Sequence, residues 1–271
     1  ITQEAIGLSA GRMAALEVSK GEWVAITDID VRPEPNWIEQ MLNASEPQDE
    51  NEDVVAVTGR TIFGQSGDVV SLIRSLEIES KYRSRPRSTS LANGPCSMFK
   101  REKLMNIGGF NPSWYHAEDM EVSLKLIESG GTIVYAPDAV VKHIPETGFK
   151  RFLSKRKRDA RAHVRIVRKY SSRKRKGPGF DFLGSSWLVL LYAPAIISMG
   201  VGLLFFAMIN NQDGMDAVKQ SVTSFDYPIW LLFPILIWWP LVLRSNLSIA
   251  LRRRPIGAVL LIMVWSFALW Q

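Results

Sequence analysis

The stretch Trp23-Val24-Ala25-Ile26-Thr27-Asp28-Ile29-Asp30 joins a short apolar run to two aspartates. The run is too short for a helix and opens with Trp and Val, which is typical of a strand buried on both faces, as in a parallel sheet. Residues i and i+2 of an extended segment point to the same side, so Asp28 and Asp30 can direct two carboxylates at one spot. Ligands of such sheets bind at the carboxyl ends of strands. The stretch therefore predicts an α/β fold with a ligand site after this strand.

The pair Asp28 and Asp30 supplies half of a divalent-metal site. Mg²⁺ or Mn²⁺ held by one or two carboxylates usually completes its coordination with substrate phosphates and water, which suits a diphosphate leaving group. Asp-x-Asp is also a common acidic turn after a strand. On these two residues alone both interpretations remain open.

A second group of polar residues follows later in the chain. Asn93-Gly94-Pro95 interrupts the chain where a backbone could approach a ligand closely. Glu118 and Asp119 begin a predicted helix, where two carboxylates either complement the helix dipole or divide the work of binding substrate and accepting a proton from a hydroxyl. His143 ends a predicted strand, as the two aspartates do, and is either structural or a third metal ligand.

The net charge of +6 is an average over two very different parts of the chain. Residues 150–176 hold 14 Lys/Arg and one acid, Asp159, whereas the rest of the chain has 19 basic and 26 acidic residues and a net charge of −7. A basic segment of this kind first suggests an arm that binds nucleic acid. The only cysteine, Cys96, excludes an internal disulfide and is consistent with a reducing compartment.

The sequence after the basic segment predicts membrane spans. Residues 187–209 are 23 residues of almost unbroken apolar character, enough to cross a bilayer. A second uncharged run, 227–243, contains three prolines and predicts a short, kinked or re-entrant span. A third begins at Pro255 and reaches the end of the sequence. Because arginines and lysines precede the first run and follow the second, the positive-inside rule places residues 1–176 in the cytoplasm.

The basic segment therefore lies where a membrane surface is expected. Apolar residues fall near one helical face between its charges, which favours an interfacial helix against anionic lipid headgroups at residues 150–176. Nucleic acid is disfavoured because the segment adjoins the membrane and lacks interleaved aromatics. We thus expect three parts: residues 1–148, a basic interfacial segment 149–181 and a transmembrane region 182–271.

Several short motifs occur in an order that identifies a family. In chain order they are Gly7-x-Ser9-Ala10-x-Arg12, Lys20-Gly21-Glu22, Thr27-Asp28-Ile29-Asp30, Gly108-Gly109-Phe110, Glu118-Asp119, and Tyr135-Ala136-Pro137 followed by His143. Over residues 7–152 the chain resembles an inverting family 2 glycosyltransferase with the Rossmann-like glycosyltransferase A fold. The chain begins at Ile1, and we expect it to be a fragment that lacks the first βαβ unit of that fold.

The resemblance implies a role for each matching residue. Asp28 and Asp30 would hold Mg²⁺ or Mn²⁺ on the diphosphate of a nucleotide-sugar donor, and His143 would join them as a metal ligand. Asp119 would be the catalytic base, with Glu118 contacting substrate. Arg12 would lie near the nucleotide, and Asn93 and Gly94 near the donor sugar or the acceptor.

The resemblance also narrows the reaction. Processive synthases of the family carry a Gln-x-x-Arg-Trp signature on the interfacial helix, which Lys155-Arg156-Lys157-Arg158 does not supply. We therefore expect transfer of a single sugar to a hydroxyl of a membrane-associated acceptor, such as a polyprenyl-linked glycan or lipid. Two alternatives remain open, a polyprenyl-phosphate sugar synthase and a non-catalytic membrane-tethered binding protein.

Overall fold

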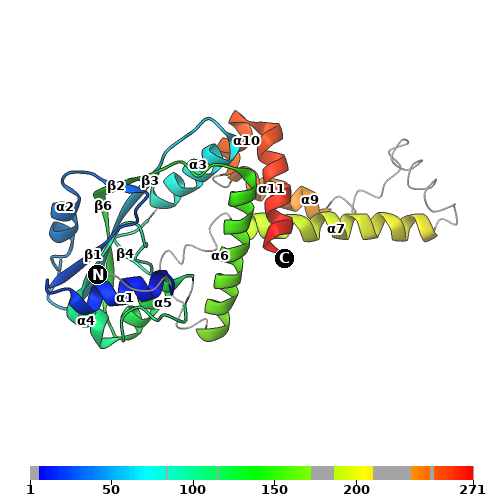
Figure 1. The fold of residues 1–271 in the computed structure, drawn as a ribbon. Coiled ribbons are helices and arrows are strands. Elements are labelled where there is room, and N and C mark those ends of the chain that lie inside the picture. Colours follow the sequence, from blue (N-terminus) through cyan, green and yellow to red (C-terminus); the bar gives the residue numbers. More distant parts are fainter. Residues whose placement is uncertain are drawn as a thin grey trace. The chain divides into compact units, whose positions relative to one another are not determined.

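Two units make up the chain, Ile1–Gly184 and Ser185–Gln271. The structure is a computed structural model, drawn in Figure 1, and it describes residues 6–83, 85–114, 116–171, 186–209, 233–244 and 247–270. Residues 172–176 of the basic segment and 227–232 of the second apolar run lie outside the described residues. The first unit holds every residue of the predicted ligand site.

A mixed sheet forms the centre of the first unit. Its strand order is β1-β5-β3-β6-β2, with the short β4 pairing with β6. β3 and β6 pair in parallel, whereas β5 runs antiparallel to both β1 and β3. The strands are β1 (Trp23–Ile26), β2 (Val31–Pro33), β3 (Val54–Phe63), β4 (Ser88–Thr89), β5 (Ser97–Lys100) and β6 (Thr132–His143).

Helices cover both faces of this sheet (Figure 1). On one face, Trp37 and Met41 pack against inward side chains of β3, β5 and β6. On the other face, Leu16, Leu104 and other apolar side chains of three helices pack against the opposite side of the same strands. The helices of this unit are α1 (Leu8–Val18), α2 (Trp37–Ala44), α3 (Val69–Arg83), α4 (Arg101–Asn106), α5 (Glu118–Glu128) and α6 (Phe149–Lys169).

The strand predicted from the central stretch is present, but its surroundings differ from the prediction. β1 ends at Ile26, directly before the aspartate turn, as expected. Its side chains are half-buried or exposed, because in the described part of the chain β1 pairs only with the antiparallel β5 and forms the edge of the sheet. The prediction of a strand buried on both faces of a parallel sheet was therefore wrong. The doubly buried parallel strands are β3 and β6, where Val54–Val57 and Ile133–Ala136 are covered on both sides.

The pairing of β2 with β6 connects two distant parts of the sequence. Val31 is in register with His143, and the backbone N–H of Ile144 donates to the carbonyl oxygen of Asp30 at 3.1 Å. The turn after β1 is thus fixed to the end of β6. This is why Asp30 and His143 are neighbours although they lie 113 positions apart in the sequence.

α6 packs on the first unit along its whole length. At its C-terminal half, Ala162, Ile166 and Tyr170 pack against Trp114, Met120 and Leu124. At its N-terminal half, Arg156 lies within a buried group of charges that includes Glu146 and Arg74 of α3. Part of the predicted interfacial helix is therefore a structural element of the unit that carries the candidate site.

The second unit is helical and contains one helix suited to a membrane. Within α7 (Ser186–Ile209), Leu188–Phe205 is long and apolar enough to cross a bilayer by length and composition. The later apolar runs give the shorter α9 (Phe233–Arg244) and α11 (Pro255–Leu269), with α10 (Leu247–Arg253) between them. The three-span division stays a prediction.

Side chains of neighbouring helices satisfy the backbone around Pro194, inside α7. Proline has no N–H to donate to Leu190 O, and Trp270 Nε1 donates to that oxygen at 2.9 Å instead. The N–H of Ala193 donates to Ser266 Oγ, also at 2.9 Å. Such replacement bonds are what an apolar surrounding requires of a proline-interrupted helix.

Candidate functional site

Arg12 of α1 joins the two acidic motifs. Its Nη1 donates to Glu118 Oε1 at 2.7 Å, and its Nη2 donates to Asp28 Oδ1 at 3.1 Å. The Arg12 and Glu118 side chains are each 9% exposed, whereas Asp28 is 33% exposed. A planar guanidinium presents several N–H donors in a rigid fork, which lets it bridge two carboxylates in a fixed geometry. The site therefore forms where the end of β1, the middle of α1 and the beginning of α5 meet.

Asp119 lies beside this bridge and is held by backbone groups. Its Oδ2 accepts from the N–H of Gly94 at 3.3 Å, and its Oδ1 accepts from the N–H of Met120 at 2.8 Å. Gly94 is closely packed, since a Cβ at that position would lie 3.1 Å from Arg12 Nη2. The structure thus brings together five of the predicted site residues, Arg12, Asp28, Gly94, Glu118 and Asp119.

The backbone before the acidic pair is strained. Ala117 has φ 59° and is the only non-glycine residue with positive φ among those described. Such a conformation costs on the order of 1 kcal/mol for a residue with a Cβ and persists only where its surroundings enforce it. Here it turns the chain sharply into α5, so that Glu118 and Asp119 both enter the site at the first turn of the helix.

Burial raises the pKa of both carboxyls. For Glu118, burial and then the charge of Asp119 raise the pKa to about 7, although Arg12 acts in the opposite direction. For Asp119, burial raises the pKa against the lowering effects of Arg12 and of the N–H groups of Met120 and Gly94. Two adjacent buried carboxyls resist carrying two charges, so the pair holds one proton near neutral pH more readily than isolated carboxyls do. A proton-accepting group poised near neutral pH is the property that general-base catalysis needs.

Asp30 and His143 form a second pair, where the turn before β2 meets the end of β6. His143 Nε2 lies 3.5 Å from Asp30 Oδ1. His143 Nδ1 lies 2.8 Å from Ile144 O, and a carbonyl can only accept, so Nδ1 donates this hydrogen bond. The ring is further fixed by stacking on Phe63 at a centroid distance of 4.3 Å. In the described part of the chain no three His, Cys, Asp or Glu residues group closely enough to hold a metal by themselves.

Asn93 belongs to a cluster that sequence reasoning missed. Arg85 lies over the rings of Tyr82 and Tyr135, at 5.3 and 5.5 Å from their centroids, and its Nη2 lies 3.4 Å from Asn93 Oδ1. Asn93 Nδ2 also contacts the hydroxyl of Tyr82. Arg85 follows α3 in a basic stretch without hydrophobic periodicity. Its contact with Tyr135 forms only when β6 is paired in the sheet, so no local sequence pattern indicated this cluster.

Comparison with known proteins connects this geometry to a family. Residues 1–108 match Glycosyl transferase family 2. The matched domain includes Arg12, Asp28, Asn93 and Gly94 and ends before Glu118. The match agrees with the family that the ordered motifs indicated.

Relatives and solved structures are similar to this chain at low identity. The Pre-mycofactocin glycosyltransferase of Mycobacterium tuberculosis is 25% identical over 158 residues, which are 55% of this chain and 33% of the relative. The chain thus spans about a third of the length of the curated relatives it matches. The structure of Mannosyltransferase PcManGT from Pyrobaculum calidifontis, in complex with GDP-Man and Mn²⁺, aligns with a TM-score of 0.51 and 19% identity over 97% of this chain and 65% of that chain. This likeness shows the glycosyltransferase A-like fold.

Proposed function

We propose that the protein is a membrane-bound inverting glycosyltransferase that moves one sugar from a nucleoside-diphosphate sugar to a hydroxyl of a membrane-associated acceptor. The observation that carries the proposal is the bridge by Arg12 between Asp28 and Glu118. It joins the predicted donor-binding turn to the predicted catalytic pair, which lie 90 positions apart in the sequence. The family 2 match and the glycosyltransferase relatives support the same class of reaction.

In this proposal Asp119 is the general base. It is held by the N–H groups of Gly94 and Met120, which fix its orientation, and its raised pKa makes it a stronger proton acceptor than an exposed carboxylate. Asp119 accepts the proton of the acceptor hydroxyl as the oxygen attacks the anomeric carbon. Glu118 and Arg12 orient the donor beside it. A single in-line displacement inverts the configuration at that carbon.

The residues at the end of β1 fit a divalent cation. Asp30 Oδ1 and His143 Nε2 lie 3.5 Å apart, and Asp28, in the same turn after β1 as Asp30, is 33% exposed. Two protein ligands suit Mg²⁺ or Mn²⁺ that completes its coordination with substrate phosphates. The structure of the mannosyltransferase with GDP-Man and Mn²⁺ supports such a cation. The bound cation would neutralise the charge of the departing nucleoside diphosphate.

The membrane part of the proposal rests on α7 and on the basic α6. One helix suited to a bilayer follows a basic helix, so a lipid-linked or glycan acceptor and anionic lipids at residues 150–176 are the expected partners. The charge distribution supports a cytoplasmic catalytic unit in an integral protein of the cell membrane.

Thermal stabilisation of the full chain by a panel of nucleotide sugars tests the donor site. The measurement uses protein in nanodiscs with and without Mn²⁺, because a ligand that binds the folded state raises the unfolding temperature. We expect a metal-dependent shift with one donor and its loss in the Asp28→Ala, Asp30→Ala double variant. A folded protein that responds to no donor would contradict the proposal and favour a membrane-tethered binding protein.

A further inference from the structure

The two halves of α6 differ in how their charges are compensated. In the N-terminal half, Arg156 pairs with Asp159 at 3.0 Å, and Lys155 and Arg156 lie 3.9 and 4.0 Å from the buried Glu146. In the C-terminal half, Arg161 and Arg168 form no ion pair with any described residue. Arg161 and Arg168 therefore leave positive charge near the C-terminal end, as Lys150, Arg151 and Lys157 do near the other end.

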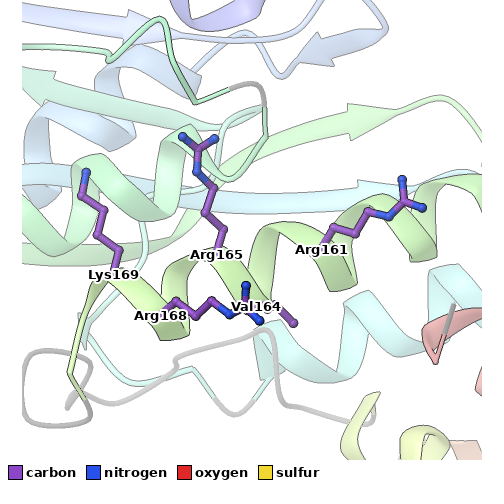
Figure 2. Close-up of a pocket in the computed structure, with 5 residues that line it drawn as sticks. All are labelled: Arg161, Val164, Arg165, Arg168 and Lys169. Carbon is purple, nitrogen blue, oxygen red and sulfur yellow. The ribbon is translucent and has the colours of Figure 1, made fainter.

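These cations surround a groove of about 360 Å³. Its lining residues recur at the spacing of successive helical turns, so they share one side of α6 (Figure 2). Arg168 and Lys169 also lie in the last turn, where cations complement the helix dipole. The dipole does not account for cations one and two turns earlier. The groove is lined by Arg161, Val164, Arg165, Arg168 and Lys169.

Two of the cations are fixed to the loop that precedes the catalytic pair. Arg165 Nη1 donates to Ser113 O at 2.9 Å, and its guanidinium lies 4.2 Å from the ring centroid of the buried Trp114. Lys169 Nζ lies 5.1 Å from the same ring and 3.3 Å from Glu121 Oε1. Glu121 follows the catalytic pair on the first turn of α5. One edge of the groove is thus anchored to the chain segment that carries Glu118 and Asp119.

Exposed apolar side chains accompany these cations. Val164 lines the groove and is 48% exposed, and Val167, on the adjacent side of the helix, is 39% exposed. Cations beside exposed apolar groups suit an amphiphile, whose anionic head contacts the guanidinium groups while its chain covers the valines. Arginine guanidinium groups are the preferred partners of phosphate oxygens.

We propose that this groove binds the phosphate or diphosphate head of a lipid, and that this lipid is the acceptor. The inference rests on the proposed function, because it assigns the acceptor class of that site. Arg161 and Arg168 supply unpaired charge, and Arg165 sets the distance between the bound head and the catalytic loop. The acceptor hydroxyl lies on the part of the molecule beyond this anionic anchor, which leaves Asp119 free to act on it.

Binding of farnesyl diphosphate to the full chain in phosphatidylcholine nanodiscs tests the inference. Inorganic pyrophosphate and farnesol are the comparison ligands, and EDTA is present so that anions do not bind through a divalent cation at the donor site. The test variant is Arg161→Gln, Arg168→Gln. The matched control is Lys150→Gln, Arg151→Gln, which removes two exposed cations from the same helix outside the groove. An Arg161→Lys, Arg168→Lys variant keeps the charge.

We expect farnesyl diphosphate to bind more tightly than either comparison ligand. The test variant should weaken its binding about tenfold, whereas the control should change it less than about twofold. The lysine variant should retain most of the affinity. Equal affinities for pyrophosphate and farnesyl diphosphate would contradict the proposal that the ligand is a lipid. Equal weakening by the control variant would show that binding depends on the general surface charge of α6 and not on the groove.

Donor binding tests the proposed function independently of the proposed lipid-binding groove. The test variant should keep the metal-dependent thermal shift with a nucleotide sugar, because Arg161 and Arg168 do not contact the donor-site residues. If the test variant keeps the donor shift and also binds farnesyl diphosphate as wild type does, the proposed lipid-binding groove is wrong. The proposed transferase function is then unaffected. If no donor binds while the groove holds the lipid diphosphate, the proposed transferase is wrong and a lipid-binding protein remains.

Discussion

Arg12 lies 2.7 Å from Glu118, and this contact holds the beginning of α5 against α1. The same guanidinium donates to Asp28, so one side chain connects the proposed donor-binding turn with the proposed catalytic pair. Most of the chemistry proposed for this protein depends on that connection.

Replacement of Arg12 should therefore affect donor binding and transfer together. Arg12→Ala leaves Glu118 without its closest cation, and we expect kcat/KM to fall on the order of a hundredfold. Arg12→Lys keeps the charge but cannot donate to both carboxylates in the same geometry, so it should recover only part of the loss. Steady-state transfer and the donor-induced thermal shift measure both effects. Full activity in Arg12→Lys would show that a positive charge at this position is enough for transfer and that the two-donor geometry of arginine is not needed.

Asp119→Asn tests the base directly. We expect transfer to a hydroxyl acceptor to fall about a hundredfold or more, because the amide cannot accept the proton, while donor binding persists. A polyprenyl-phosphate acceptor is already ionised and needs little general base. Retention of most activity in Asp119→Asn would therefore favour the polyprenyl-phosphate sugar synthase.

The acidic pair should make both activity and stability depend on pH. Since the pKa of Glu118 is raised to about 7, the folded protein binds more protons than the unfolded chain between about pH 4.5 and 7. Stability contributed by the pair therefore increases as pH falls through this window, by at most about 1.4 kcal/mol per pH unit for one proton. Denaturant unfolding of wild type and Glu118→Gln at pH 5 and pH 7.5 should show this difference. Transfer should instead increase from pH 6 to 8, as the pair loses its proton.

The buried charges between α3 and α6 should contribute to stability. Glu146 is 2% exposed on its side chain, and its Oε2 lies 3.3 Å from Arg74 Nε. Glu146→Gln leaves Arg74 and Arg156 with less compensation and should lower the free energy of unfolding by about 3 kcal/mol. The control is Glu79→Gln, whose 2.6 Å pair with Arg83 is exposed and should contribute less than about 1 kcal/mol. Equal effects of the two variants in denaturant unfolding would contradict a structural role for the buried group.

Gly59 should not tolerate a side chain. A Cβ there would lie 2.2 Å from Ala139 O and 2.4 Å from Cys96 Sγ, at the register shift between β3 and β6. We expect Gly59→Ala to destabilise the first unit by about 3 kcal/mol, measured by thermal unfolding. Gly200→Ala, where a Cβ meets nothing within 4 Å, serves as the control and should be close to neutral. A neutral Gly59→Ala would mean that β6 can move away from β3 at this point.

The sequence predicted the candidate site better than the sheet around it. Asp28 follows a strand and Glu118 begins a helix, as local patterns indicated, because both signals arise from neighbouring residues. The edge position of β1 and the reversed β5 depend on pairing between distant strands, which no local pattern contains. Arg85 was missed for the same reason, since its position between Tyr82 and Tyr135 exists only after the sheet forms.

The sequence by itself determined which residues are candidates for the chemistry: the Asp-x-Asp turn, the Glu118-Asp119 pair, and the basic segment before an apolar helix. Their residue types and short spacings set these properties directly. Only the tertiary structure decided that Arg12 joins the two acidic motifs, that Asp30 meets His143, and that Arg165 and Lys169 of α6 lie against Trp114. Those relationships arise from strand register and helix packing, which bring side chains together across about a hundred residues of chain.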